Sequence, residues 1–418
     1  MKKTKKEEKK MKRKERRGGC KEKGITLVAL VITMIVLLIL AGVTIATLTG
    51  DNGILTRASE GKEKTEEAQR EELKHLTALE AATNLKDTTH IDNSTGEEKT
   101  IKIPAGFAVS QIKGENSIKD GLVIMDSNEN EYVWIEVPKN DTIYQTAGIN
   151  VKSFTDEDYN KIYNDLKSYT YDYNKNRTNW GWSDKWYNGC GIDSELEYNN
   201  KKKKMLKSIY ENEGFWIGRY EMGSNEYVLE NNANDNRVPI CKKNAYPYNF
   251  VTCSQAQKLA DTFSSGNYTS SLMFGVQWDL VCKYIEEKEK IPVEQINQNS
   301  STWGNFLDSE FEVNNGCYLV GEQISEGWNT ISSNYIKVKD TKIVFTTGAT
   351  ERNKILNIYD FAGNVSEWTL EYSKDTNDIN NVCANRGGNT NFATNAAYPG
   401  GSDIYYNSYG VGFRSTLY

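Results

Sequence analysis

Residues 357–369 read NIYDFAGNVSEWT, a run in which turn-forming residues lie between apolar ones. Gly363 and Asn364 suit a turn that needs positive φ, because glycine lacks a Cβ and asparagine tolerates the left-handed region. Trp368 is expected in a core. Glu367 could pair with the distant Arg414 or cap backbone groups. Structural roles are therefore expected for most of this run.

The same run resembles the signature of the formylglycine-generating enzyme (sulfatase-modifying factor) family, whose usual form is close to N-x-Y-D-M-x-G-N-V-x-E-W. Further matches follow in the family's order over residues 101–418. They are an early strand at 215–221, helices at 254–260 and 274–284 (with Trp278), and the closing motifs Arg386-Gly387-Gly388 and Gly412-Phe413-Arg414. The resemblance implies an α+β, C-type-lectin-like fold with long irregular loops. The short strands, two helices and polar loops predicted from the residues agree with it.

Catalytic members of the resembled family bind copper through two cysteines that follow the R-G-G motif, since thiolates are the soft ligands that monovalent copper requires. Those positions fall on Phe392 and Ala397 here, and residues 386–418 contain no cysteine. Cys383 precedes the motif and is not expected to substitute alone. We therefore expect a catalytically inactive domain, with a formylglycine-generating oxidoreductase as the alternative.

Other catalytic and metal chemistry is also restricted. The two histidines, His75 and His90, both precede residue 101, so histidine acid–base or metal chemistry is not expected in the domain. The run 126–130 begins like an EF-hand loop, but Glu131 and Val137 replace its glycine and glutamate. No cofactor is predicted. Bound calcium occurs in the resembled family, so a structural calcium ion is an expectation without assigned ligands.

The C-terminal segment 389–411, NTNFATNAAYPGGSDIYYNSYGV, is rich in Tyr, Ser, Asn and Gly. This composition is typical of adaptable binding surfaces, although plain polar loop filling is the alternative. In C-type-lectin-like proteins diversified by retroelements, which the domain resembles, the variable stretch lies between R-G-G and a terminal G-F-R. The segment occupies that position, so we expect it to contact a protein or glycan ligand outside the cell. The predicted contact residues are Asn389, Asn391, Phe392, Asn395, Tyr398, Asp403, Tyr405, Tyr406 and Tyr409.

Upstream, a hairpin is predicted over 121–137, with its turn at 126–130. Residues 139–212 have weak periodicity and are predicted to be an insertion. Residues 54–83 favour a helix, with Leu73, Leu76 and Leu79 forming one apolar stripe for packing on the body. Six cysteines lie in the body, and whether they pair is left open.

Residues 25–48 carry no charge, and 24 helical residues would extend about 36 Å, enough to cross a bilayer. Residues 1–24 hold 13 Lys/Arg against 4 Glu. Such a basic leader predicts an N-terminus inside and a C-terminal domain outside the cell membrane. Subtracting this +9 from the net charge of −6 leaves −15 for the rest, which argues against nucleic-acid binding.

The run from Lys23 to Leu30 resembles the type IV prepilin N-terminus, over residues 1 to about 85. That resemblance implies a prepilin peptidase that cuts between Gly24 and Ile25. Ala29 replaces the family's usual glutamate, which makes a static anchor a better expectation than a filament subunit. A structural pilin-like subunit and an unprocessed anchor are the alternatives.

The expected organisation is a single-pass, membrane-anchored and surface-displayed binding protein in contact with the lipid bilayer. Its parts are a basic leader (1–24), a transmembrane helix (25–49), a helical stalk and linker (50–100), and the formylglycine-generating-enzyme-like domain (101–418) with its insertion (139–212).

Overall fold

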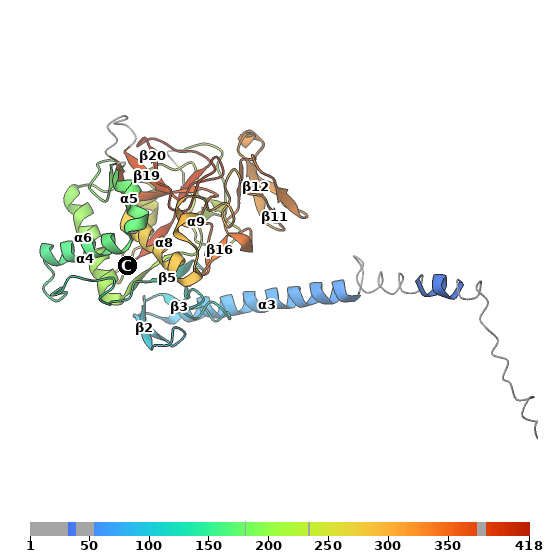
Figure 1. Cartoon of the computed structure of the whole chain (residues 1–418), viewed down its shortest axis with the longest axis horizontal. Helices are drawn as coiled ribbons and strands as arrows, with labels where there is room; N and C mark the ends of the chain where they lie inside the picture. The colour runs from blue at the N-terminus through green and yellow to red at the C-terminus, as the bar shows by residue number, and fades with distance from the viewer. Residues whose placement is uncertain (1–31, 39–53, 180, 233–234, 374–381) are drawn as a thin grey trace, which may run out of the picture. The chain divides into compact units, whose positions relative to one another are not determined.

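The computed structural model describes residues 32–38, 54–179, 181–232, 235–373 and 382–418 (Figure 1). The chain divides into two compact units, residues 1–70 and 71–418. In the first unit the described residues are helical, at 32–38 and in the first part of helix α3 (Ile54–Thr83). Gly24 and Ile25, with the predicted cleavage point between them, lie outside the described residues.

The expected transmembrane helix is not supported. Across the ranges that the structure describes, no helix is long and apolar enough to cross a bilayer. Helix α3 is long but carries Lys and Glu throughout, and charges in lipid are costly. The expected fold class, an α+β domain preceded by a transmembrane helix, and the expected single-pass membrane localisation are both corrected: the described residues form an α+β structure.

The end of helix α3 belongs to the second unit, and its buried face differs from the predicted leucine stripe. Ala78 and Ala81 are buried, whereas Leu76 and Leu79 are about half exposed. Lys74 also forms an ion pair of 2.9 Å with the buried Glu131. Small residues therefore make the close contact, and the stripe prediction was wrong.

The larger sheet of the second unit is antiparallel, in the order β10-β22-β7-β5-β4-β3. Its strands are β3 (Phe107–Val109), β4 (Val123–Asp126), β5 (Glu131–Glu136), β7 (Gly214–Gly218), β10 (Ser270–Leu272) and β22 (Ser415–Leu417). Strands β4 and β5 pair directly, which confirms the predicted hairpin. Its turn is closed by the Asp126 carboxylate, which accepts from the Asn128 and Asn130 amides, both at 2.8 Å.

A second sheet brings the signature and the closing motifs together. It contains β20 (Gly400–Ser402), β19 (Cys383–Arg386), β18 (Ser366–Ser373), β21 (Val411–Phe413) and β6 (Trp182–Ser183). Strand β18 is antiparallel to β19 and parallel to β21. Glu367 consequently lies between Arg386 and Gly412, so one strand joins all three motifs.

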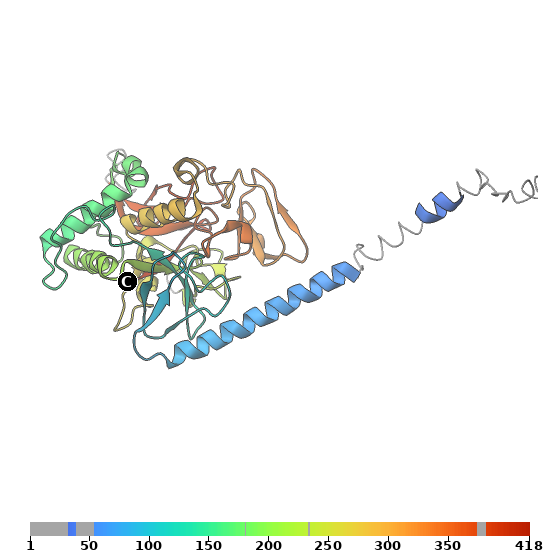
Figure 2. The same cartoon turned by 60° about the horizontal axis from the view of Figure 1, so that its bottom comes forward.

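Helices cover much of the stretch predicted to be an insertion. They are α4 (Asp156–Tyr169), α5 (Tyr171–Asn179) and α6 (Glu195–Asn212). Ile162 and Leu166 of α4 and Met205 and Ile209 of α6 are fully buried in the main core. In both views α4 and α6 lie at one end of this unit, and β11 (Phe311–Val313) and β12 (Cys317–Val320) lie at the other (Figure 2). Residues 139–212 therefore form part of the core.

Helices α7 (Cys253–Asp261) and α8 (Gly275–Glu289) confirm the two predicted short helices. Trp278 of α8 stacks on Phe361 at 4.3 Å between ring centroids, and Trp368 donates from Nε1 to the Val251 carbonyl at 2.8 Å. The six described cysteines are free thiols, and five of them are buried.

Short elements complete the described chain. They are β1 (Thr88–Asp92), β2 (Lys99–Ile103), β8 (Gly223–Ser224), β9 (Tyr246–Pro247), α9 (Val293–Asn297), η2 (Ile324–Glu326), β13 (Asn329–Thr330), β14 (Tyr335–Lys337), β15 (Ile343–Phe345), η3 (Glu351–Asn353), β16 (Lys354–Ile355) and β17 (Ile358–Tyr359).

Candidate ligand-binding site

The signature turn anchors the candidate segment. Gly363 and Asn364 have φ of +77° and +60°. The Asn364 carboxamide donates to Glu221 Oε2 at 2.8 Å and accepts from the Phe345 amide at 2.9 Å. The Gly363 amide donates to the Gly387 carbonyl at 2.9 Å. This last hydrogen bond connects the signature to the residues just before the C-terminal segment.

Two buried ion pairs hold the closing motifs. Arg414 contacts Glu367 at 2.6 Å and also donates to the Gly218 and Tyr359 carbonyls, each at 2.8 Å. Arg386 contacts Asp279 at 2.6 Å. Gly387 and Gly388 follow with positive φ, and Phe413 is fully buried. These motif residues are inside the domain and act as its framework.

Three buried carboxyl groups surround this framework. Burial raises the pKa of Asp360 to about 6 and that of Glu367 to about 6. Burial and the neighbouring Asp360 raise the pKa of Glu221 well above its usual range. One guanidinium, that of Arg414, lies beside these acids. Ionisation of all three carboxyl groups would leave excess negative charge in the core.

This cluster predicts a pH dependence of stability. A carboxyl whose pKa is raised on folding stabilises the protein below its unfolded pKa, and this contribution is lost as pH rises through the folded value. For Asp360 the window runs from 3.8 to about 6. In Asp360→Asn, the free energy of unfolding should therefore decline less than in wild type between pH 4 and pH 6, by about 1.4 kcal/mol for each pH unit of this window. Urea denaturation across this range measures the difference.

Asp340→Asn is the matched control. Asp340 has φ of +62°, close to the +55° of Asp360, but its side chain is exposed. The control should keep the wild-type pH dependence. Equal declines in Asp360→Asn and wild type would contradict the prediction.

Within the candidate segment, four of the nine predicted contact residues have inward-facing contacts. Asn389 is buried, and its amide donates to Ser366 Oγ at 2.9 Å and to the Gly410 carbonyl at 3.1 Å, which links the two ends of the segment. Asn395 is also buried. Tyr409 is half-buried, its hydroxyl donates to the Asn391 carboxamide, and its ring lies against a small apolar cluster.

The remaining aromatic side chains face outward. Phe392, Tyr398, Tyr405 and Tyr406 are 63%, 41%, 76% and 43% exposed. Asp403 is half-buried and turns the chain by accepting from the Tyr405 amide at 2.8 Å. A ligand could reach these five side chains without rearrangement of the segment.

Asp403 and Tyr405 open into a hollow of about 510 Å³. Residues far away in sequence complete it: Trp186, Tyr187 and Asn188 from the predicted insertion, and Tyr372 of β18. The Tyr187 and Tyr372 rings stack at 6.2 Å. The sequence prediction missed these residues, although the aromatic density of residues 182–187 was a usable signal.

No cysteine side chain is among the described residues that line this hollow. The Tyr187 hydroxyl lies 2.9 Å from Cys383 Sγ, but Cys383 is fully buried and does not line the hollow. The pKa of the Cys383 thiol is lowered, mainly by a hydrogen bond from Cys253 and to a smaller extent by one from Tyr187. The lining consists of aromatic rings, apolar side chains, one carboxylate and one carboxamide.

The positions that correspond to the resembled family's copper ligands do not fit copper. Phe392 presents an exposed ring, and Ala397 is a buried methyl group. Neither side chain can supply a thiolate. In the described ranges, no group of three or more His, Cys, Asp or Glu side chains is placed to hold a metal ion. The structural calcium ion stays a prediction.

Neither family models nor curated proteins give a match to the chain. Among solved structures it is similar to Treponema denticola variable protein 1, with 12% identity and a TM-score of 0.26. That alignment covers 49% of this chain and 84% of the other. A likeness at this TM-score supports no assignment of fold or function.

Proposed function

We propose that residues 101–418 form a non-catalytic, sulfatase-modifying-factor-like recognition domain that binds a glycan at the hollow beside Tyr405. The proposal rests on a difference between the ends and the middle of the C-terminal segment 389–411. Its two ends are held by buried ion pairs and hydrogen bonds, while Phe392, Tyr398, Tyr405 and Tyr406 are exposed between them. Rigid ends reduce the entropy lost when such side chains bind a ligand.

The chemistry of the hollow favours a glycan. Trp186, Tyr372 and Tyr405 line the hollow, and the C–H face of a sugar can lie on the face of an aromatic ring. Asp403 and Asn188 supply acceptors and a donor for sugar hydroxyl groups. A volume of about 510 Å³ is within the usual range for small-ligand sites and admits one or two sugar rings.

Tyr405→Ala should weaken glycan binding at least tenfold, because the variant removes the most exposed ring of the lining. The protein is first applied to an array of bacterial and mammalian glycans, and the affinity for the strongest hit is then measured by calorimetry. The melting temperature should stay near that of wild type. Tyr409 is left unchanged, since its partly buried ring supports the fold.

Tyr171→Ala is the matched control, because Tyr171 is also exposed, at 62%, and does not line the hollow. It should bind as wild type does. Absence of binding to any glycan, or equal losses in both variants, would overturn the proposal and favour a protein ligand for the segment.

A further inference from the structure

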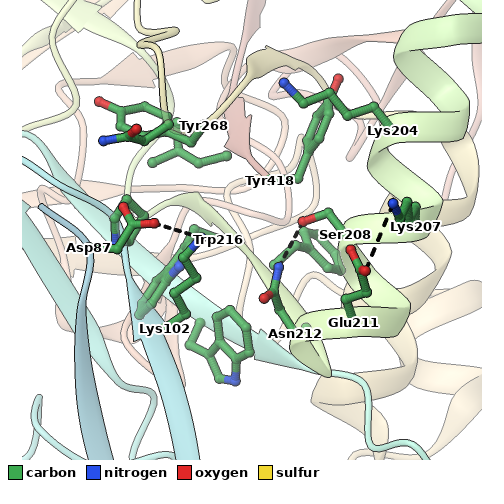
Figure 3. Close-up of a pocket in the computed structure, with 16 residues that line it drawn as sticks. Asp87, Lys102, Lys204, Lys207, Ser208, Glu211, Asn212, Trp216, Tyr268 and Tyr418 are labelled. Carbon is green, nitrogen blue, oxygen red and sulfur yellow. Dashed lines mark hydrogen bonds and ion pairs between the residues drawn. The ribbon is translucent and has the colours of Figure 1, made fainter. Parts of the chain in front are cut away.

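The hollow beside Tyr405 has one sign of charge. Among the described residues that line it, Asp403 is the only one with a charged side chain. A second hollow, of about 300 Å³, differs in this respect, because both lysines and acids line it (Figure 3). In that hollow Lys102 contacts Asp87 at 2.7 Å. The charge of a ligand therefore matters most at the hollow beside Tyr405.

The Asp403 carboxylate is held in place by the turn that it begins. Asp403 directly follows β20, in which Ser402 pairs with Cys383 of β19. Its Oδ1 atom accepts from the Tyr405 amide at 2.8 Å, and its carbonyl accepts from the Tyr406 amide at 3.0 Å. No described residue donates to its Oδ2 atom, so this oxygen can accept a hydrogen bond from a ligand.

Aromatic side chains make up half of the described lining. They are Trp186, Tyr187, Tyr372 and Tyr405. The Tyr187 and Tyr372 rings stack with centroids 6.2 Å apart, and the Tyr187 hydroxyl lies 2.9 Å from Cys383 Sγ. Aromatic rings attract a cation that comes within about 6 Å of the centroid on the ring face. The rings and the carboxylate therefore favour the same sign of ligand charge.

The cost of covering Asp403 distinguishes neutral from charged sugars. Asp403 is half-buried, and a ligand in the hollow removes further water from its carboxylate. A sugar hydroxyl replaces one hydrogen bond of that water, whereas an ammonium group donates a stronger, charge-assisted one. A carboxylate or sulfate on the sugar would instead meet a like charge.

We propose that the hollow beside Tyr405 selects a glycan with a protonated amino group, such as a hexosamine without an N-acetyl group. This inference rests on the proposed glycan-binding function, and it names Asp403 as the residue that recognises the amine. Asp403 accepts a hydrogen bond from the ammonium group, and the aromatic lining adds cation–π attraction.

Three disaccharides with the same β1,4 linkage test the inference: the dimers of glucosamine, N-acetylglucosamine and glucose. They differ only at the 2-position, which carries an amine, an acetamide or a hydroxyl group. Each is titrated into the protein by calorimetry at about pH 6, where an amine is protonated. We expect the glucosamine dimer to bind about fivefold tighter or more than either neutral dimer. Raising the salt concentration from about 0.05 M to 0.5 M should reduce this preference.

Asp403→Asn locates the selection. The carboxamide oxygen can still accept from the Tyr405 amide, but the charge is lost. The affinity for the glucosamine dimer should therefore fall to that for the glucose dimer, and the latter should change by less than about twofold. Asp141→Asn is the matched control, because it removes an exposed carboxylate that does not line the hollow and should keep the preference. Both variants should melt as wild type does.

Equal affinities of the wild-type protein for the three dimers, or an unchanged preference in Asp403→Asn, would overturn the amine inference without affecting the glycan site. Lack of binding of the glucosamine dimer would also overturn it. The glycan proposal fails separately, if no glycan of the array binds or if Tyr405→Ala and Tyr171→Ala lose binding equally. The two failures can therefore be distinguished.

Discussion

Arg414→Ala is expected to lower the free energy of unfolding by about 3–5 kcal/mol, because it leaves Glu367 as a buried charge without its partner. The Arg414 and Glu367 side chains are 0% and 1% exposed, and they contact each other at 2.6 Å. The variant also removes the donors to the Gly218 and Tyr359 carbonyls. Urea denaturation followed by circular dichroism measures the loss.

Lys342→Ala is the control for this prediction. Lys342 pairs with Glu322 at 3.1 Å, but both side chains are exposed, so the change should cost less than about 1 kcal/mol. A second variant, Glu367→Leu/Arg414→Met, replaces the pair by apolar groups and should be less destabilised than Arg414→Ala. Comparable stability of Arg414→Ala and Lys342→Ala would show that the pair is not needed for the fold.

Gly363→Ala should be the second most damaging single change, with a loss of about 3 kcal/mol or more. Its φ of +77° is unfavourable for alanine, at a cost of about 1–2 kcal/mol. In addition, the new Cβ would lie 2.5 Å from the Asn305 carbonyl carbon and 2.7 Å from its nitrogen. Gly363 and Asn305 form an isolated β-bridge. Backbone atoms cannot rotate away as a side chain can, so this bridge must shift.

Gly106→Ala separates these two causes. Gly106 has φ of +84°, but a Cβ there would meet no atom within 4 Å. Its cost should therefore be the conformational part alone, about 1–2 kcal/mol. If both glycine variants lose the same free energy, the close approach to Asn305 contributes nothing and the explanation fails.

These two predictions concern the buried motif residues that form the framework. The proposed glycan site depends instead on exposed side chains of the C-terminal segment. The exposed Tyr405 and the half-buried Tyr409 are four positions apart in one segment. The Tyr409 hydroxyl donates to Asn391 and its ring lies against an apolar cluster, whereas the Tyr405 side chain is 76% exposed. Substitution at Tyr405 should therefore change binding, while substitution at Tyr409 should change stability. Tyr405, Tyr406 and Tyr409 were all predicted to contact a ligand. That prediction is best tested at Tyr405 and Tyr406.

Features that depend on local residue chemistry could be predicted from the residues alone. Positive φ at Gly363 and Asn364, the hairpin of β4 and β5, and helices α7 and α8 follow from turn preferences and short-range periodicity. The lack of thiolates at Phe392 and Ala397 is likewise a property of the residues themselves.

Which polar and aromatic side chains face outward depends on the folded arrangement of the chain. Asn389, Asn395 and Tyr398 were all predicted to contact a ligand, but the first two are buried and the third is exposed. The hollow beside Tyr405 needs Trp186 and Tyr187, more than 200 residues away, which helices α4 to α6 bring into the core region. The leucine stripe of α3 and the membrane-spanning helix were predicted from periodicity and hydropathy, and neither is seen in the described residues. Periodicity predicts which residues lie on the same face of a helix or strand. Whether that face is buried depends on which distant parts of the chain pack against it.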